Sequence, residues 1–214
     1  MKKLIIIGAG GYAKSVIDSL NTSLFHMIGF LDDIKEKNTY HLGYPVLGNS
    51  FDCLDSSQDY VFFVAIGHNG KRKLWYDKLK ESHLCLINII DESAIVSKYA
   101  SVGEGCFIGK LAIINHGAEI GNNAIINTRA LVEHGCKIGN HVNVSTNSTL
   151  NGDVVAKEGC FIGSGSIVNG QIEIGEWSLV GSGAIVIRNV LPNTTVVGCP
   201  AREIISKSCK YNKL

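Results

Sequence analysis

The chain has 214 residues, a formal net charge of +1 at pH 7, 45% hydrophobic residues, 24 glycines and 3 prolines. This length suits one large domain or two small ones with a real core. The near-neutral charge offers no electrostatic footprint for nucleic acid or an anionic membrane, and no apolar run approaches the roughly 18 residues of a membrane span.

The chain opens on "MKKLIIIGAGG", two lysines followed by a short apolar run. The run ends at Ile7 and glycines follow at once, so we interpret it as a buried first strand and not as a signal peptide. We therefore expect a cytoplasmic protein whose seven cysteines are reduced. Because no C-x-x-C pair occurs, a zinc ribbon or a redox motif is not expected.

A glycine loop joins this strand to an amphipathic helix. Gly8, Gly10 and Ala13 form the pattern G-x-G-x-x-A, in which backbone N–H groups and a helix N-terminus can approach a phosphate or another anion. A second strand, "HMIGFLDD", ends in Asp32 and Asp33. An acidic residue at this place can accept a hydrogen bond from a ribose hydroxyl.

A third strand, "DYVFFVAIG", ends in Gly67 and precedes a helix, and a fourth, "CLINII", leads onward. Residues 1–89 are thus predicted to form a Rossmann-like βαβ domain. It is too short for a full dinucleotide domain, which has two such halves. The glycine pattern alone leaves two alternatives open: a tight turn that binds nothing, and an NAD-dependent dehydrogenase.

From Ile90 to Val186, every sixth residue is a branched aliphatic except Ala156. The next residue is usually Gly or Asn, for which we expect positive φ, and the residue two before is mostly small. Such a frame predicts a solenoid of short strands. Three cysteines occupy the small-residue position and are expected in the core rather than at a metal or catalytic site: Cys106, Cys136 and Cys160.

The repeat resembles the left-handed parallel β-helix of hexapeptide-repeat acyltransferases, in which three hexapeptides make one coil and positions 18 apart stack. We assign residues 90–214 to it, with a C-terminal tail. The whole chain resembles the NeuD-type sialic acid O-acetyltransferases and the related PglD- and PerB-type N-acetyltransferases of nucleotide amino sugars. The matching segments are "GAGGYAKSVIDSL", "GFLDD", "AIGHNGKRK", "NTRALVEHG", "STNSTLNGDV", "IVNGQIEIG" and "VVGCPAR". "INTRALVEHG", "TLNGDV" and "VIRNV" are closer to the NeuD type.

The resemblance implies a mechanism. His134 of "EHG" would be the general base that takes the proton of the attacking sugar group, without an acyl-enzyme. The N–H of Gly152 would hold the oxyanion. Acetyl-CoA contacts carry over to Asn143, Gly152, Gly163, Ser164, Gly181 and Ser182. Acceptor contacts carry over to Gly10, Gly11, Tyr12, Asp32, Asp33, Gly67 and Gly70.

Two positions depart from the PglD type. Gly135 stands where those enzymes have a Glu that partners the catalytic ring, which leaves Glu133 and Asn127 as the nearest candidates for orienting His134. Tyr12 stands where they carry a His. We expect His141 to be a surface residue. His116, 18 residues before His134, should lie one coil away on the same face, either as a stacked surface residue or as a ligand.

The resemblance implies a homotrimeric, acetyl-CoA-dependent sialic acid O-acetyltransferase of bacterial surface polysaccharide synthesis, acting on free or CMP-linked acceptor. We expect no metal cofactor and, from the charge and the apolar runs, no nucleic acid or membrane partner. The alternatives are an N-acetyltransferase of UDP- or GDP-linked amino sugars, a non-catalytic scaffold of a sugar pathway, and a zinc-dependent carbonic anhydrase of the same fold. For the last, the spacing of His116, His134 and His141 fits poorly.

Overall fold

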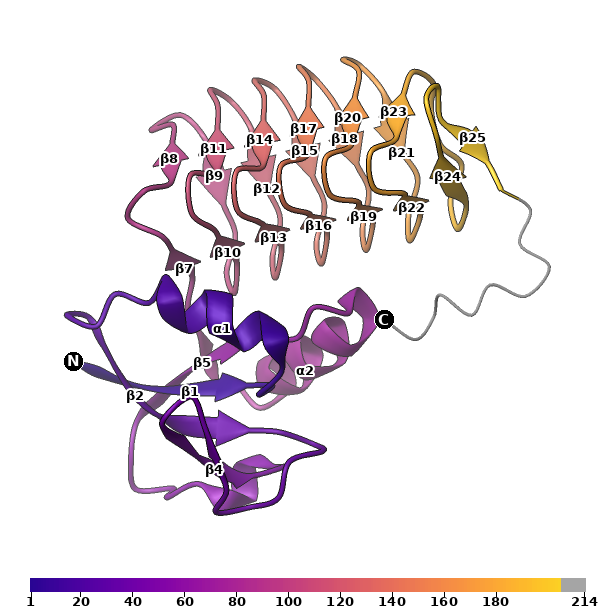
Figure 1. Ribbon diagram of the computed structural model, residues 1–214. Helices are drawn as coiled ribbons and strands as arrows, with labels where there is room; N and C mark the ends of the chain where they lie inside the picture. The colour runs from indigo at the N-terminus through magenta and orange to yellow at the C-terminus, as the bar shows by residue number, and fades with distance from the viewer. Residues whose placement is uncertain (205–214) are drawn as a thin grey trace.

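The computed structural model describes residues 1–204, in which a six-stranded sheet domain packs against a long solenoid (Figure 1). The sheet has the strand order β3-β4-β2-β1-β5-β6, parallel except for β3 with β4. Its elements are β1 (Lys2–Ile7), α1 (Gly11–Asp18), β2 (Phe25–Leu31), β3 (Tyr40–His41), β4 (Tyr44–Gly48), a 3-10 turn (Phe51–Cys53), β5 (Tyr60–Val64), α2 (Asn69–Glu81) and β6 (Cys85–Leu86).

The first strand lies between β2 and β5 in the sheet, and both of its faces are covered by helices. Leu4 and Ile6 pack with α1, whereas Ile5 and Ile7 pack with α2, and all four are fully buried. A continuous apolar run is what a parallel strand covered on both sides requires. The carboxyl ends of β1, β2 and β5 consequently meet at one edge of the sheet, where ligands bind in open α/β sheets.

The segment "CLINII" is divided between the two parts of the protein and does not form the single strand predicted. β6 (Cys85–Leu86) pairs with β5, and β7 (Ile89–Ile90) pairs with β10. Asn88 at the junction donates to the carbonyl of Gly103 (2.7 Å) and accepts from the N–H of Cys106 (2.9 Å). This amide ties the chain to the solenoid at the point where it leaves the sheet.

The solenoid is a parallel β-helix with three faces, and paired residues are 18 apart, as predicted. The first face contains β7 (Ile89–Ile90), β10 (Phe107–Ile108), β13 (Ile125–Ile126), β16 (Asn143–Val144), β19 (Phe161–Ile162), β22 (Leu179–Val180), β24 (Thr195–Val197) and β25 (Arg202–Glu203). The second contains β8 (Ile95–Val96), β11 (Ile113–Ile114), β14 (Leu131–Val132), β17 (Thr149–Leu150), β20 (Ile167–Val168) and β23 (Ile185–Val186). The third contains β9 (Ser101–Val102), β12 (Glu119–Ile120), β15 (Lys137–Ile138), β18 (Val155–Ala156) and β21 (Glu173–Ile174).

The second residue of most strands points inward, and the small residues close the corners. Cys106, Cys136 and Cys160 are fully buried and donate to the carbonyls of the next coil (Sγ···O 3.1, 3.2 and 2.9 Å). Burial raises the pKa of these thiols to about 11, 11 and 12. The predicted core role of the three cysteines is therefore confirmed.

The predicted reason for the repeated glycines is wrong. Gly109 and Gly121 have no left-handed φ, which instead falls two residues later, as at Leu111 (+55°) and Asn123 (+54°). A Cβ at Gly109 or Gly121 would lie 2.8 Å from a backbone nitrogen of the next coil. These glycines are thus required by the close stacking of coils and not by the turn.

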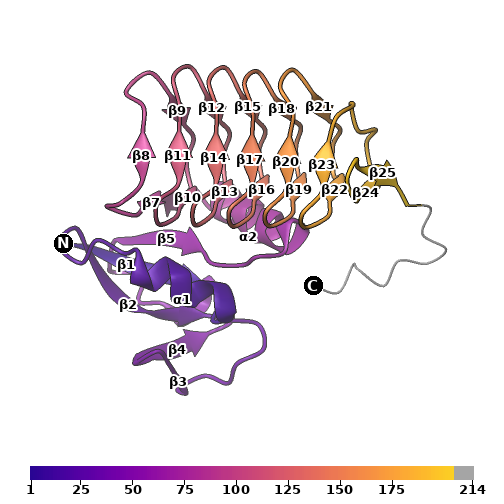
Figure 2. The same cartoon turned by 45° about the horizontal axis from the view of Figure 1, so that its top comes forward.

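The N-terminal domain docks on the first face and on the corner between the third and first faces (Figures 1 and 2). Tyr12 packs edge-on against Phe107 at 5.5 Å. Arg72 of α2, 1% exposed, donates to the carbonyls of Asn123 (3.1 Å) and His141 (2.7 Å) in the solenoid. Burial lowers the pKa of Arg72 to about 10, so the guanidinium stays charged at neutral pH.

His141 is consequently not the surface residue predicted. It is 3% exposed, its Nδ1 lies 2.8 Å from the side-chain amide of Asn123, and Tyr76 covers its ring at 5.3 Å. Burial lowers the pKa of His141 to about 4. The physical reason is the docking of α2 over this corner, which the repeat pattern does not contain.

Candidate active site

A cleft of about 500 Å³ lies at the carboxyl ends of β1, β2 and β5. It is lined by six of the seven residues predicted to contact the acceptor: Gly10, Gly11, Tyr12, Asp32, Asp33 and Gly67. The seventh, Gly70, lies in the first turn of α2 and does not line it. A Cβ at Gly10 or Gly11 would meet no atom within 4 Å, so this loop offers bare backbone to a ligand at the N-terminus of α1.

The two aspartates at the end of β2 have different surroundings. Asp32 accepts from the backbone N–H groups of Ala9 (2.7 Å), Ile34 (2.9 Å) and Lys35 (2.9 Å). Partial burial alone would raise the pKa of Asp32, but these donors outweigh it and lower the pKa below 3.8. Asp32 therefore braces the glycine loop, and Asp33 remains as the acidic group available to a ligand.

Helix α2 supplies four cleft residues that the sequence did not predict: Lys71, Leu74, Trp75 and Lys78. The indole N–H of Trp75 donates to Asp33 (3.3 Å), and the ammonium of Lys78 lies 4.6 Å from the centre of the Trp75 ring. The available signal was the spacing of the lysines, seven residues apart on one helix face. They give the cleft two cationic groups suited to an anion.

Tyr12 lines the cleft, but its hydroxyl is buried and has no hydrogen-bond partner within residues 1–204. Burial raises the pKa of Tyr12 above its ordinary value. The ring is therefore part of the packing between the two domains, and it offers the cleft a wall and no free hydroxyl.

His134 lies in the turn between β14 and β15, on the corner between the second and third faces, here called the His134 corner (residues 116–117, 134–135, 152–153 and 170–171). Its exposed ring lies over Gly152 of the next coil. A Cβ at Gly152 would be 2.5 Å from Cε1 and 2.6 Å from Nε2. The N–H of Gly152 donates no hydrogen bond within the described residues. A proton acceptor and a free backbone donor thus lie side by side.

Within residues 1–204, neither predicted partner forms a hydrogen bond with the His134 ring. Glu133 accepts from the backbone N–H of His134 (3.2 Å), and Asn127 accepts from the N–H of Thr128 (2.8 Å). His116 lies one coil before His134, as predicted, where its exposed ring packs on Tyr99 at 4.5 Å.

The residues expected to contact acetyl-CoA lie elsewhere on the solenoid. Ser164 and Ser182 are exposed on the corner between the first and second faces, here called the Ser164 corner, next to Gly163 and Gly181. Asn143 lies on the outer side of the first face, 6% exposed. Of the predicted coenzyme residues, Gly152 alone lies at the His134 corner.

One chain therefore holds three separate groups of predicted site residues. The sheet domain with its cleft docks on the first face, and the His134 corner lies between the other two faces, hence on the opposite side of the triangular coil. The second face separates the His134 corner from the Ser164 corner, and its outward residues are mostly apolar, with Ile95 62% and Ile167 39% exposed.

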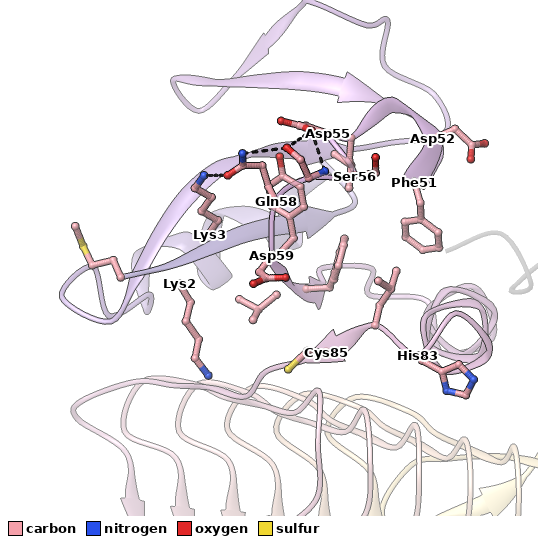
Figure 3. A pocket seen from close by; sticks show the side chains of 17 residues that line it. Lys2, Lys3, Phe51, Asp52, Asp55, Ser56, Gln58, Asp59, His83 and Cys85 are labelled. Atoms are coloured by element: carbon pink, nitrogen blue, oxygen red, sulfur yellow. Dashed lines mark hydrogen bonds between the residues drawn. The ribbon is translucent and has the colours of Figure 1, made fainter.

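A larger hollow of about 1200 Å³ lies at the opposite edge of the sheet (Figure 3). Lys2, Lys3, Asp59 and Cys85 line it, at the amino ends of β1, β5 and β6. It contains none of the predicted residues, and parallel sheets bind ligands at the carboxyl ends of their strands. The residues predicted to contact the acceptor thus line the glycine-loop cleft and not this hollow.

Within residues 1–204, no cluster of three His, Cys, Asp or Glu side chains is arranged to hold a metal ion. None of the helices in the same range has both the length and the apolar character needed to cross a bilayer.

Comparisons with known proteins agree with both parts of the fold. Residues 3–79 match the PglD N-terminal domain family, and residues 99–132 and 158–188 match hexapeptide-repeat transferase families. A UDP-N-acetylbacillosamine N-acetyltransferase of Bacillus subtilis (strain 168) is 38% identical over 113 residues, 50% of this chain and 51% of the relative. The match thus spans about half the length of that curated relative.

Two solved structures are similar over nearly the whole chain. PerB from Caulobacter crescentus, in complex with CoA and GDP-perosamine, is 33% identical with a TM-score of 0.89, over 95% of this chain and 98% of that one. The acetyltransferase domain of PglB from Neisseria gonorrhoeae FA1090, in complex with acetyl coenzyme A, is 29% identical with a TM-score of 0.88, over 95% and 99%. The chain therefore belongs to the PglD/PerB family of hexapeptide-repeat sugar acetyltransferases.

Proposed function

We propose that this protein transfers an acetyl group from acetyl-CoA directly to a sugar, with His134 as the general base. The observation that carries the proposal is the ring of His134 seated on Gly152, whose N–H is free within residues 1–204. The ring takes the proton of the attacking hydroxyl or amine as that group adds to the thioester carbonyl. The N–H of Gly152 stabilises the negative oxygen. The C–S bond then breaks, and the imidazolium returns the proton to the thiolate of coenzyme A.

For the acceptor, we propose the hydroxyl of a sialic acid, free or CMP-linked. The cleft offers the N-terminus of α1 with Lys71 and Lys78 for an anion, and Asp33 for a hydroxyl. A sialic acid carboxylate or a nucleotide phosphate suits the same cationic groups. The preference for sialic acid rests on the NeuD-type segments and on Gly135 and Tyr12, where the chain departs from the amino-sugar enzymes.

The second candidate is N-acetylation of a UDP- or GDP-linked amino sugar. It is favoured by the named activity of the Bacillus subtilis relative and by the GDP-perosamine bound to the Caulobacter crescentus protein. Both candidates place the acceptor in the same cleft and use the same base, so they differ in the atom that is acetylated.

We propose further that the active unit is a homotrimer and that each site is shared by two copies. The second face is apolar and lies between the two corners that hold His134 and Ser164. Packing this face on another copy would cover Ile95 and Ile167. It would bring the His134 corner of one copy to the Ser164 corner and cleft side of its neighbour, with the coenzyme between them.

Product analysis tests the acceptor. The purified protein is incubated with acetyl-CoA and sialic acid, CMP-sialic acid, or UDP- and GDP-linked amino sugars, and products are identified by mass spectrometry before and after hydroxylamine, which cleaves esters and spares amides. We expect a hydroxylamine-sensitive acetyl group on a sialic acid, and none with His134→Ala. An acetylated amino sugar without an acetylated sialic acid would establish the second candidate. Acetylation of no sugar would refute both.

A further inference from the structure

Two glycines on the His134 corner each make room for a side chain of the neighbouring coil. The ring of His134 occupies the space over Gly152. In the same way, a Cβ on Gly135 would overlap Oδ1 of Asp153. Asp153 is in the left-handed region (φ +60°), which Asp tolerates better than most residues. Its N–H donates to the carbonyl of His134 (2.9 Å). Residues 134, 135, 152 and 153 thus form a four-residue patch. In it the imidazole of His134 lies over Gly152 and the carboxylate of Asp153 lies over Gly135.

Asp153 carries the carboxylate of this corner that has no hydrogen-bond donor within residues 1–204. Glu133 is bonded to the backbone N–H of His134, whereas the Asp153 carboxylate is exposed and accepts no hydrogen bond from any residue between 1 and 204. The other exposed ionisable side chains on or next to this corner are Lys98, Tyr99 and His116 on the preceding coils and Arg188 on the second coil after Asp153. No side chain at position 135 separates Asp153 from the coil of His134.

We infer that Asp153 is the positioning residue of His134, an assignment that rests on the proposed function. Its negative charge stabilises the imidazolium that forms when His134 takes the acceptor's proton, and it favours the ring orientation in which that proton is received. The proton passes from the acceptor to the ring and then to the departing thiolate, so Asp153 itself neither gains nor loses one. A second copy covering the corner lowers the local dielectric and strengthens this interaction.

The test compares Asp153→Asn with Glu133→Gln, a matched loss of one carboxylate on the same corner. We expect Asp153→Asn to lower kcat about tenfold, which corresponds to about 1.36 kcal/mol of lost transition-state stabilisation. The acid limb of its kcat profile should move to lower pH, because an imidazole without the carboxylate releases its proton more readily. Glu133→Gln should leave both unchanged. Gly135→Asp with Asp153→Gly, which moves the carboxylate to the other position of the patch, should restore part of the rate.

A kcat and profile of Asp153→Asn like those of the wild type would overturn the inference. So would a lower kcat with an unmoved acid limb, since that pattern indicates a structural role. His134→Ala is measured in the same series: if it remains active, the proposed base is wrong, whereas an inactive His134→Ala beside a normal Asp153→Asn refutes the role of Asp153 alone.

Discussion

Replacing Gly152 by alanine should inactivate the enzyme by moving a ring that belongs to another coil. The new Cβ would lie 2.5 Å from Cε1 of His134, and ordinary van der Waals contact begins at 3.4 Å, so the ring must move by about 1 Å. A displacement of 1 Å at a reacting group costs about 10²-fold in rate. This corresponds to roughly 3 kcal/mol of transition-state stabilisation at 1.36 kcal/mol per tenfold.

The fold should tolerate the same change. Gly152 has no left-handed φ, and the exposed ring of His134 can rotate into solvent. We therefore expect the free energy of unfolding to change by less than about 1 kcal/mol. Gly139→Ala is the matched control for damage to the solenoid: its Cβ would lie 2.8 Å from the backbone nitrogen of Glu158, where no side chain can move aside. That variant should lose stability.

Steady-state kinetics with saturating acetyl-CoA, together with calorimetry of coenzyme binding, measures the effect. Gly152→Ala should lower kcat about 10²-fold and leave the Kd of coenzyme A within about threefold. In a double-mutant cycle, adding Gly152→Ala to His134→Ala should cost nothing further, because the ring that it displaces is gone. A Gly152→Ala enzyme with normal kcat, or full additivity with His134→Ala, would refute the reasoning.

Three further predictions concern single side chains. His134→Ala should lower kcat by roughly 10²–10⁴-fold without a change of mass in solution by light scattering. His116→Ala should change kcat much less; equal losses would contradict the assignment. Asp33→Asn should raise the acceptor KM without a change in melting temperature. Asp32→Asn should lower both the stability of the loop and the affinity for the acceptor. The lowered pKa of Asp32 reflects hydrogen bonds that stabilise the fold above pH 3.8 and are lost as the pH falls below that value. The pKa of His141 falls from 6.5 to about 4 on folding, so the unfolded chain binds more protons between these two pH values. The free energy of unfolding measured in urea should therefore decrease from pH 6.5 to pH 4. His141→Gln should flatten this dependence.

The solenoid and the proximity of His134 to Gly152 could be predicted almost completely from the sequence. A six-residue period of inward aliphatics determines the coil, and 18 residues between two positions place them in contact on adjacent coils. The cleft was predictable for a similar reason, since the carboxyl ends of parallel strands meet at one edge.

Features that depend on contacts between distant segments were not predictable. His141 is buried because α2 docks on its corner through Arg72, a contact across 69 residues. The β3–β4 hairpin was missed because its turn uses Leu42 and Gly43, both at positive φ, in place of the usual Asn-Gly. The hydrogen bonds that Asp32 accepts from backbone N–H groups likewise depend on the folded shape of the loop and could not be predicted from its composition.

The central claim is that one reaction site takes its cleft from one copy and His134 from another. Complementation between two inactive variants tests it most directly. Gly10→Trp should fill the cleft, because a Cβ there points into open space, and His134→Ala removes the base. Coexpressed in equal amounts, the two should form mixed oligomers in which about a quarter of the sites have both parts intact. We expect about that fraction of wild-type acetyl transfer per site. Mixed oligomers as inactive as either parent would contradict the shared site.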